Sequence, residues 1–566
     1  MASPTTAIPA ASLFSSTSAI DSLCIGSGRF LRSVLVPALV AANYRPAIVQ
    51  TRGRTFLEYC CGKDTNNNDP TQIHGEGESE FRSWTYEVDT IHFDGRIETT
   101  SVPFWGAGTL GSPEGKSDVL ELCSKLGVRN SNGDKPLIIG VGVTEAGLSS
   151  SSMKAMNDLY EVLVALSKRK HHHQQQICVI NTDNVSQNGN VIQTFMMELA
   201  EASDEAETMK AFLTNSVVFH NTMVDRITSQ RPGSDGLVPR AEPNPLKALV
   251  IEDLGKALPS SFAGDTLRKE HGVVVRGVSG KLDADIALKL RIANGIHTAA
   301  AHAMALSGLV TTDVLSSKSY EARLLMKYLD SFFEHQILKV VEATTKFEGI
   351  RSDAQAVYED WRRRLCHAHF GLSTFFITQN GAAKGGIRIG PTIKDLILSS
   401  QPIQCSTVFA LAAILIFLTP ASVLTSTPAE TVWAGALDRK RNTEQSEDIK
   451  LTESGTATYA DGLTYNLMGG QYDFRCDCDV NEIPLPKVLY SIDSGSQAVD
   501  CEDVVRSYLC KPNGGNLSSV ADTPTFGILV KAVAALYARI RGGDGILDVL
   551  RDLDLEASCE CLVDGD

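Results

Sequence analysis

Apolar and polar positions in the first part of the chain change repeatedly between a strand pattern and a helix pattern. A strand entering a glycine turn is predicted for "SLCIGSG" at 22–28, an amphipathic helix for "RFLRSVLVPALVAANY" at 29–44, and a second strand for "PAIVQTR" at 46–52. A helix between two strands is the usual crossover of a parallel pair. The stretch therefore predicts a β-α-β unit.

The same alternation continues to about residue 277. Further strands are predicted for "PLIIGVGVT", "ICVINTDN", "SVVFHNTMV", "ALVIEDL" and "GVVVRGV", and a helix for "SMKAMNDLYEVLVALSKRK". Alternating strands and helices are typical of a doubly wound parallel sheet with helices on both faces. We predict a Rossmann-like α/β domain at 21–277, preceded by a flexible tail at 1–20.

From about residue 280 the strand pattern fades and helical periodicity dominates, as in "SYEARLLMKYLDSFFEHQILKVVEATTKF". The longest apolar run extends from Val408 to Leu418, whereas spanning a bilayer takes roughly 20 residues, so a buried helix is predicted there. We predict a mostly α-helical second domain at 278–566 that carries substrate and catalytic residues, with a polar insertion near 421–460.

Composition narrows the classes of partner. The chain of 566 residues has a formal net charge of −15 and no long basic run, which argues against nucleic acid. Its first residues lack the arginines of a mitochondrial presequence and the apolar core of a secretory signal, but they leave a plastid transit peptide open. We expect a cytoplasmic monomer or small homo-oligomer that binds a small molecule and neither nucleic acid nor membrane.

The cysteines and histidines do not form a metal-binding pattern. Thirteen cysteines in a chain this long are expected to be reduced thiols. Neither Cys476 with Cys478 nor Cys559 with Cys561 has an accompanying C-x-x-C or Cys/His quartet, and the histidines of "HHHQQQ" stand in a low-complexity loop. No metal site is expected.

The turn "GSGRFLR" has part of a dinucleotide-binding pattern. Gly26 permits a tight turn, and Gly28 lets a pyrophosphate approach the backbone at a helix N-terminus. The third glycine of that pattern is absent. The second strand ends without an acid for a ribose 2′-hydroxyl, and Arg52 follows, with Arg54 beyond. Two interpretations are open: arginine beside the 2′-phosphate of NADP, or solvated loop arginines.

The segment "KLRIANGIHT" at 289–298 places three polar side chains in apolar surroundings. On a helix of 3.6 residues per turn, His297 falls about 80° and Asn294 about 140° from Lys289, so all three share one side. A desolvated lysine has a lowered pKa and accepts a proton from an alcohol, while an amide donates to the alkoxide. The alternative is a structural helix whose Lys and His extend to solvent.

Several motifs occur in the order of one family. They are "GSGRFLR", "VTEAGL" at 143–148, "NTDNVSQNG" at 181–189, "NTMVDRIT" at 221–228, "EPNPLKALVIEDL" at 242–254 and "KLRIANGIHT". On these motifs the chain resembles the mannitol dehydrogenase family of long-chain, metal-independent polyol and uronate oxidoreductases, over most of residues 22–400.

The resemblance implies a set of site residues. Lys289 would be the general base of alcohol oxidation or the acid of ketone reduction, Asn184 and Asn294 would hold the developing oxyanion, and His297 would orient substrate. Further residues are implied in two groups: Val224, Asp225 and Lys384 for substrate, and Gly26, Gly28, Arg29, Phe30, Arg52 and Glu145 for NAD or NADP. Lys384 stands where the family usually has arginine, and so offers a point charge instead of a bidentate fork.

One position departs from the family pattern. A glutamate that often precedes the catalytic lysine by three residues is replaced by Ile286, and the adjacent Asp285 points about 100° away on a helix. The first expectation is an NAD(P)-dependent enzyme that interconverts a polyol and a ketose such as mannitol and fructose. A hexuronate or sugar phosphate as substrate, and a sugar- or nucleotide-binding relative without turnover, stay open.

Overall fold

The computed structural model divides the chain into two compact units, Met1–Ile286 (unit 1) and Ala287–Asp566 (unit 2). The division falls inside helix α8 (Lys281–Leu288), somewhat later than the boundary expected from the sequence. The structure describes residues 12–15, 19–66, 83–126, 135–143, 145–169, 175–183, 185–234, 236–309, 311–345, 347–372, 374–378, 381–418, 449–451, 456–459, 464–466, 501–512 and 514–563.

Unit 1 is built on a seven-stranded sheet with the strand order β1-β6-β3-β2-β7-β8-β9. All neighbours pair in parallel except β1, which is antiparallel to β6 at the edge. The predicted β-α-β unit is confirmed, because β2 and β3 pair in parallel. The strands are β1 (Leu13–Phe14), β2 (Ser22–Ile25), β3 (Pro46–Gln50), β6 (Gly106–Thr109), β7 (Leu137–Val141), β8 (Ile177–Asn181) and β9 (Val217–His220).

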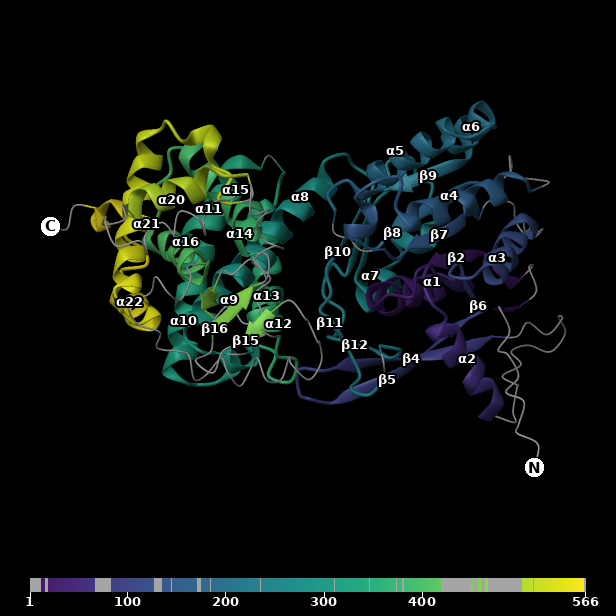
Figure 1. Ribbon diagram of the computed structural model, residues 1–566, viewed down its shortest axis with the longest axis horizontal. Coiled ribbons are helices and arrows are strands. Elements are labelled where there is room, and N and C mark those ends of the chain that lie inside the picture. The colour runs from purple at the N-terminus through teal and green to yellow at the C-terminus, as the bar shows by residue number, and fades with distance from the viewer. Residues whose placement is uncertain are drawn as a thin grey trace. The chain divides into compact units, whose positions relative to one another are not determined.

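Helices cover both faces of this sheet (Figure 1). Side chains alternate along each strand, so that Ile138 faces one core and Ile139 the other. The helices of the first face are α1 (Val36–Ala41), α2 (Thr55–Asn66) and α7 (Asp265–His271), and those of the second are α3 (Pro113–Lys125), α4 (Lys154–Ser167), α5 (Asn188–Glu201) and α6 (Ala206–Ser216). Within the expected flexible tail, β1 pairs with β6, and Ala19 and Ile20 are buried.

Two of the predicted strands, and the second half of the strand predicted for "SVVFHNTMV", do not join this sheet. Strands β10 (Thr222–Val224), β13 (Leu249–Glu252) and β14 (Val273–Arg276) form a separate three-stranded sheet. Only Asn221 separates β9 from β10, and a parallel neighbour would need a crossover of a dozen or more residues. Strand β10 therefore does not pair beside β9, and it pairs antiparallel with β13 instead.

A four-stranded sheet lay outside the sequence prediction. Its order is β11-β12-β4-β5, with the long hairpin β4 (Trp84–Ile91) and β5 (Ile97–Phe104) joined to β11 (Thr228–Gln230) and β12 (Pro239–Ala241). Arg231 ties the two parts together, because its guanidinium donates to both carboxylate oxygens of Asp89, at 2.8 and 2.6 Å.

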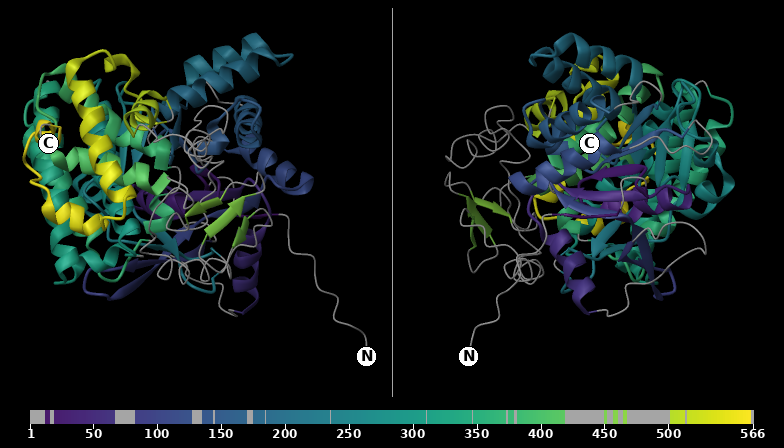
Figure 2. Two further views of the ribbon diagram at one scale, coloured as in Figure 1. Left: turned by 60° about the vertical axis from the view of Figure 1, so that its left-hand side comes forward. Right: turned by 90° about the vertical axis from the view of Figure 1, so that its right-hand side faces the viewer.

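Unit 2 is mostly helical, as predicted. The apolar run forms α16 (Cys405–Leu418), which is buried along its whole length and packs against other helices of this unit. Figure 2 shows helices throughout the yellow, C-terminal part of the ribbon. The remaining helices are α9 (His297–Leu306), α10 (Tyr320–Phe332), α11 (Leu338–Thr344), α12 (Ile350–Leu365), α13 (Thr374–Thr378), α14 (Gly381–Lys384), α15 (Gly390–Leu398), α20 (Cys501–Cys510), α21 (Pro524–Arg541) and α22 (Ile546–Asp552).

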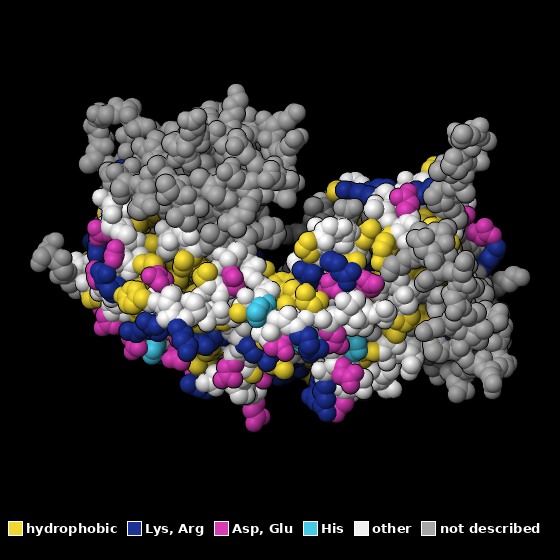
Figure 3. All heavy atoms as spheres, turned by 90° about the horizontal axis from the view of Figure 1, so that it is seen from below, with side chains coloured by type: hydrophobic (Ala, Val, Ile, Leu, Met, Phe, Trp, Pro, Cys, Tyr) yellow, Lys and Arg dark blue, Asp and Glu magenta, His cyan; other side chains and the backbone are white. Residues whose placement is uncertain are grey.

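The polar insertion expected near 421–460 lies largely outside the described residues, as do Cys476, Cys478 and the "HHHQQQ" loop. The strands β15 (Ile449–Leu451), β16 (Thr456–Tyr459) and β17 (Thr464–Asn466) form a small antiparallel sheet. In the part of the chain that is described, no helix is long and apolar enough to cross a membrane. On the face shown in Figure 3, acidic and basic side chains are interspersed.

Candidate active site

The glycine turn follows β2 at the carboxyl edge of the seven-stranded sheet. Gly26 has a φ of +110°, and a Cβ there would lie 2.5 Å from the carbonyl oxygen of Gly142, so the turn requires glycine. The Gly26 N–H donates to Val49 O and the Gly142 N–H to Ile25 O, each at 2.7 Å. Gly28 is exposed at the start of the following helix. The turn thus fits a pyrophosphate, because backbone N–H groups and an uncovered glycine stand at a helix N-terminus.

The third glycine of the fingerprint is missing from the helix, and glycines on the strand side allow the close approach in its place. In the full fingerprint it lets helix and strand approach closely. Here a π-helical segment, Leu31–Leu35, carries the large side chains, and the glycines are Gly140 in β7 and Gly142 directly after it. A Cβ on Gly142 would lie 2.8 Å from Leu31 Cδ1, and one on Gly140 would lie 2.7 Å from Leu35 Cδ2. Close packing is therefore kept although the small residues are on the other element.

Arg32 is a buried structural cation and does not point into the turn as a ligand-binding group. Its Nε donates to Ser27 O and its Nη2 to Gly236 O, both at 2.7 Å, and its Nη1 donates to Leu237 O. Burial lowers the pKa of the guanidinium. Arg32 therefore joins the glycine turn to a loop about 200 residues later in the chain, which local sequence reasoning missed.

The end of β3 is where an acid would bind the adenosine ribose. Gln50 stands there, and its Oε1 accepts from the N–H groups of Phe56, at 2.9 Å, and Leu57, at 3.2 Å. The amide oxygen thus caps α2 and is occupied. Arg52 is exposed and Arg54 half-buried in the intervening loop. Position 50 therefore offers no anion to a 2′-hydroxyl, and arginines lie beside it.

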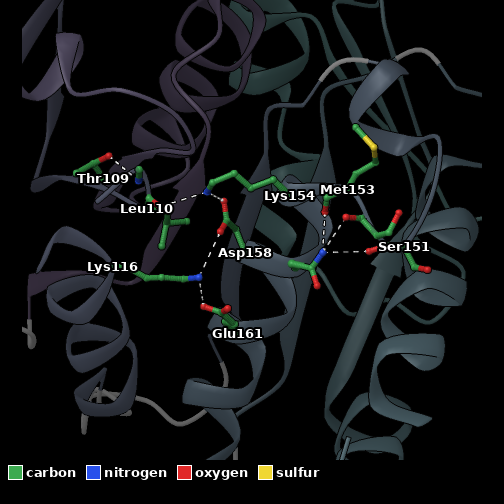
Figure 4. Close-up of polar contacts among 11 residues, drawn as sticks. Thr109, Leu110, Lys116, Ser151, Met153, Lys154, Asp158 and Glu161 are labelled. Atoms are coloured by element: carbon green, nitrogen blue, oxygen red, sulfur yellow. Dashed lines mark hydrogen bonds and ion pairs between the residues drawn. The ribbon is translucent and has the colours of Figure 1, made fainter. Parts of the chain in front are cut away.

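The loop after β3 is hydrogen-bonded to the end of β6, and the connection from β6 to α3 is in turn held by a lysine. Thr109 Oγ1 donates to Gly53 O at 2.7 Å, and Lys154 Nζ donates to Leu110 O at 3.2 Å. Figure 4 shows Lys154 and Lys116 meeting the buried Asp158, at 2.5 and 3.7 Å. Burial raises the pKa of Asp158, and the lysines oppose that rise. Asp158 therefore holds Lys154 in place, and Lys154 holds the connection between β6 and α3 beside the predicted cofactor site.

Two of the family motifs are joined by hydrogen bonds of buried polar side chains. Asn184 itself and the side chain of Glu145, which opens the 3₁₀ helix Glu145–Leu148, lie outside the described residues. Buried Asn188 donates to Asp183 O at 3.0 Å and to Thr222 Oγ1 at 2.9 Å, and Thr222 Oγ1 donates to Asn181 O at 2.7 Å. The "NTDNVSQNG" and "NTMVDRIT" motifs are thus one hydrogen-bonded structure.

The other predicted residues of unit 1 have different surroundings. Val224 is in β10 with its side chain in the hydrophobic core. Asp225 is half-buried, and its N–H donates to Ala248 O at 3.0 Å. Arg29 is exposed, while Phe30 packs partly against the core. Arg29 and Phe30 therefore lie directly after the glycine turn, whereas the side chain of Val224 is part of the hydrophobic core.

The polar trio is Lys289, Asn294 and His297. Lys289 and Asn294 lie in a π-helical segment, Lys289–Ile296, and His297 is the first residue of α9, which follows directly. A π-helix is bonded i→i+5, so Asn294 stands one turn after Lys289 on the same side, and the angles expected for an α-helix do not apply. Lys289 is 8% exposed, whereas Asn294 and His297 are half-buried. The His297 ring lies edge-on to Trp361, with centroids 6.0 Å apart. Single π-helical turns are frequent at functional sites.

Ile286 and Asp285 point in different directions on α8. Ile286 packs with Met223, Val250 and Leu282. The buried Asp285 carboxylate accepts from Lys247 Nζ at 2.6 Å and from Arg276 Nε at 2.7 Å. Asp285 is therefore held in an ion triad of unit 1, and position 286 has no group that transfers a proton.

A second basic residue accompanies Lys384 and was missed as a candidate. Arg388 Nη1 donates to Thr298 Oγ1 at 2.9 Å, and Thr298 Oγ1 donates to Asn294 O at 2.8 Å. Lys384 Nζ donates to Ile377 O at 2.8 Å. A Cβ on Gly295 would lie 3.1 Å from Arg388 O, so this segment packs directly on the trio's helix. The four-residue spacing of Lys384 and Arg388 was the available sequence signal.

The family resemblance is confirmed by comparison with known proteins. Residues 114–256 match the family model for the mannitol dehydrogenase Rossmann domain. The D-mannonate oxidoreductase of Escherichia coli (strain K12) is 27% identical over 216 residues, which are 32% of this chain and 42% of that protein. The chain thus matches less than half the length of this curated relative.

Solved structures confirm the predicted fold class over most of the chain. A D-sorbitol dehydrogenase in substrate-free form has a TM-score of 0.63 at 16% identity, over 94% of this chain and 96% of that one. The Pseudomonas fluorescens mannitol 2-dehydrogenase, in a ternary complex with NAD and D-mannitol, has a TM-score of 0.57 at 15% identity, over 94% of both chains. An N-terminal Rossmann-like domain followed by a mostly helical domain is therefore the fold of this chain.

Proposed function

We propose that the chain is an NAD(P)-dependent oxidoreductase that interconverts a secondary alcohol of a polyol or sugar acid with the corresponding ketone. The observation that carries this proposal is the continuous helical segment on which Lys289, Asn294 and His297 follow one another, with Lys289 nearly buried. The glycine turn of unit 1 supports it, because its backbone fits a dinucleotide.

Lys289 is the proton acceptor in this proposal. The nicotinamide, when bound, accepts or supplies the hydride at the carbon that changes oxidation state. In oxidation the neutral Lys289 amine takes the hydroxyl proton while that carbon loses its hydride; in reduction the ammonium returns a proton to the carbonyl oxygen. Loss of hydration favours the neutral form of an amine, and the near burial of Lys289 suits that role.

Asn184 and Asn294 stabilise the alkoxide in this proposal, and His297 orients the substrate. An amide N–H donates without carrying charge, so it stabilises developing negative charge without holding the product ion. The Thr298 hydroxyl fixes the backbone of Asn294, and Arg388 in turn holds Thr298. This support keeps the residue that donates to the alkoxide in a constant position.

The proton leaves Lys289 without a carboxylate at position 286. Ile286 belongs to an apolar cluster, and Asp285 is engaged by Lys247 and Arg276. Proton exchange with solvent is therefore expected to depend on buffer or water in place of a side-chain relay.

A sugar acid is the second candidate for the substrate, beside a neutral polyol. Arg388 is bonded to the trio's helix, and Lys384 stands one helical turn earlier in the same segment. Two cations at this spacing suit a carboxylate, and arginine does so with a planar fork. The sequence relative that acts on D-mannonate supports the same choice.

NADP is the cofactor that the end of β3 favours. Gln50 is committed to capping α2, and Arg52 and Arg54 follow in the adjoining loop. A 2′-phosphate gains from arginine there, whereas a free 2′-hydroxyl has no carboxylate to accept its hydrogen bond.

The test follows nicotinamide absorbance with the purified full chain. NADH and NADPH are each combined with fructose, fructuronate, tagaturonate and fructose 6-phosphate. Lys289→Ala is expected to abolish turnover with an active pair, whereas Lys339→Ala, which removes an exposed lysine of α11, keeps it. Arg388→Leu is expected to reduce the rate with fructuronate more than with fructose if the substrate is a sugar acid.

Binding measurements separate the enzyme from a relative without turnover. Fluorescence titration with NADPH reports binding whether or not a reaction follows. If NADPH binds and no substrate in the panel is turned over, the oxidoreductase assignment fails and a binding protein takes its place. Equal losses in Lys289→Ala and Lys339→Ala would contradict the role given to Lys289.

A further inference from the structure

The C-terminal turn of unit 2 is paired with the start of α16. Gln404 and Ser558 form an antiparallel bridge. Beside it, the Cys405 N–H donates to Ala557 O at 3.0 Å and the Cys559 N–H donates to Ile403 O at 2.7 Å. Main-chain hydrogen bonds therefore hold two segments, more than 150 residues apart in sequence, in a fixed register.

Two thiols meet next to this pairing. The Sγ atoms of Cys405 and Cys561 are 3.7 Å apart. Cys405 is 1% exposed at the first position of α16, whereas Cys561 is exposed in the 3₁₀ turn Cys559–Leu562. A disulfide needs about 2.05 Å between its sulfur atoms, so a small movement of the terminal turn is enough.

We propose that Cys405 and Cys561 are a redox modification site that forms a reversible disulfide with low-molecular-weight disulfides as the oxidant. The exposed Cys561 thiolate attacks one sulfur of the oxidant, forms a mixed disulfide and releases one thiol. Cys405 then attacks the Cys561 sulfur and releases the second thiol, so that two protein thiols are oxidised and one disulfide is reduced to two thiols.

The order of these steps follows from the surroundings of each thiol. Burial raises the pKa of the Cys405 thiol, and the neighbouring Cys561 raises it further, so Cys405 is a poor first nucleophile in solution. Its distance to Cys561 makes it a competent second nucleophile within the chain.

The disulfide would join the end of the chain to the most buried helix of unit 2. Helix α16 packs against α9, the helix that begins at His297. Cross-linking two positions this far apart restricts the unfolded chain. We expect oxidation to raise the melting temperature of the full-length protein by about 5 °C, reversibly with a dithiol reductant.

The experiment treats the full chain with glutathione disulfide and maps the products by mass spectrometry after trypsin. The expected product is a cross-link between peptides 395–439 and 552–566, in the wild type and in Cys559→Ser. Cys559→Ser is needed because the second peptide also holds Cys559. Cys561→Ser, at an exposed position, should lose both the cross-link and the shift in melting temperature, whereas Cys501→Ser should keep both.

Two results would overturn the proposal. One is a Cys559–Cys561 bond, or a bond from Cys561 to Cys476 or Cys478, in place of the cross-link to Cys405. The other is a stable glutathione adduct on Cys561 while Cys405 stays a free thiol. A cross-link that forms without any shift in melting temperature would remove the stabilising role but leave the modification site.

Discussion

Two π-helical segments of this protein each hold a nearly buried basic side chain. In unit 1, Leu31–Leu35 carries Arg32, whose guanidinium donates to the carbonyl oxygens of Ser27, Gly236 and Leu237. In unit 2, Lys289–Ile296 begins with Lys289. Arginine stays charged under physiological conditions, whereas a buried amine gains and loses a proton. Burial of a cation therefore does not by itself mark a catalytic group, and the role proposed for Lys289 is the one that requires a group able to release its proton.

Replacing Lys289 should produce the largest change and should change rate rather than stability. We expect Lys289→Met to lower kcat by about 10²–10⁴-fold, because a positioned acid or base contributes that much. The melting temperature should stay close to that of the wild type, since methionine keeps the apolar stem. Steady-state kinetics and thermal unfolding of Lys289→Met and Lys339→Met measure both. A melting temperature that falls with the rate would make Lys289 structural.

Replacing Arg32 should have the opposite profile. Arg32→Met leaves three carbonyl acceptors without their donor in a buried place, and we expect a loss of at least about 3 kcal/mol in unfolding free energy. Urea unfolding of Arg32→Met and of Arg96→Met, an exposed arginine of the same unit, measures the difference. An equally stable Arg32→Met protein with weakened cofactor binding would move Arg32 to the ligand site.

His302 extends the comparison to a basic group that is held neutral. Its Nδ1 bonds Thr298 O at 2.7 Å, and burial lowers its pKa to about 3. In the unfolded state the His302 pKa is about 6.5, so the unfolded chain binds a proton there that the folded protein does not bind. The contribution of neutral His302 to the unfolding free energy is therefore fully present above about pH 6.5 and is lost as pH falls below it.

The change is measurable as a difference between variants. From pH 7 to pH 5, His302 should lower the unfolding free energy by about 2 kcal/mol. His302→Leu should lack this increment, and His369→Gln, at an exposed position, should keep it. Urea unfolding at both pH values tests this. Equal pH dependence in His302→Leu and the wild type would show that His302 is protonated in the folded state.

Arg52 should give the smallest effect, because it is exposed. We expect Arg52→Ala to raise KM for NADPH about 10-fold and to leave KM for NADH unchanged, since one charge-assisted bond to a 2′-phosphate is lost. Arg268→Ala, which removes another exposed arginine of unit 1, is the control. A similar change for both cofactors would assign Arg52 to general attraction of anions instead of recognition of the phosphate.

Local sequence patterns predicted the elements that depend on local physics. The β-α-β unit around Gly26, the helical second half and the buried helix at Val408–Leu418 follow from periodicity and from glycine conformation. The family motifs predicted a Rossmann-like domain at 21–277, and residues 114–256 match the family model for such a domain. Local patterns did not predict which sheet each strand joins. Strand β10 does not belong to the predicted parallel sheet, because a single residue separates it from β9.

The sequence by itself determined the secondary elements, the glycine turn and the residue types of the polar trio. Tertiary structure decided what each polar side chain contacts. Two of the three carbonyl groups that accept from Arg32 lie about 200 residues away in sequence, and Arg388 donates to Thr298 at a separation of 90 residues. The π-helical form of Lys289–Ile296 was likewise not readable from a 3.6-residue period. The physical reason is that periodicity and turn conformation act over a few residues, whereas partners of buried polar groups are set by packing of distant segments.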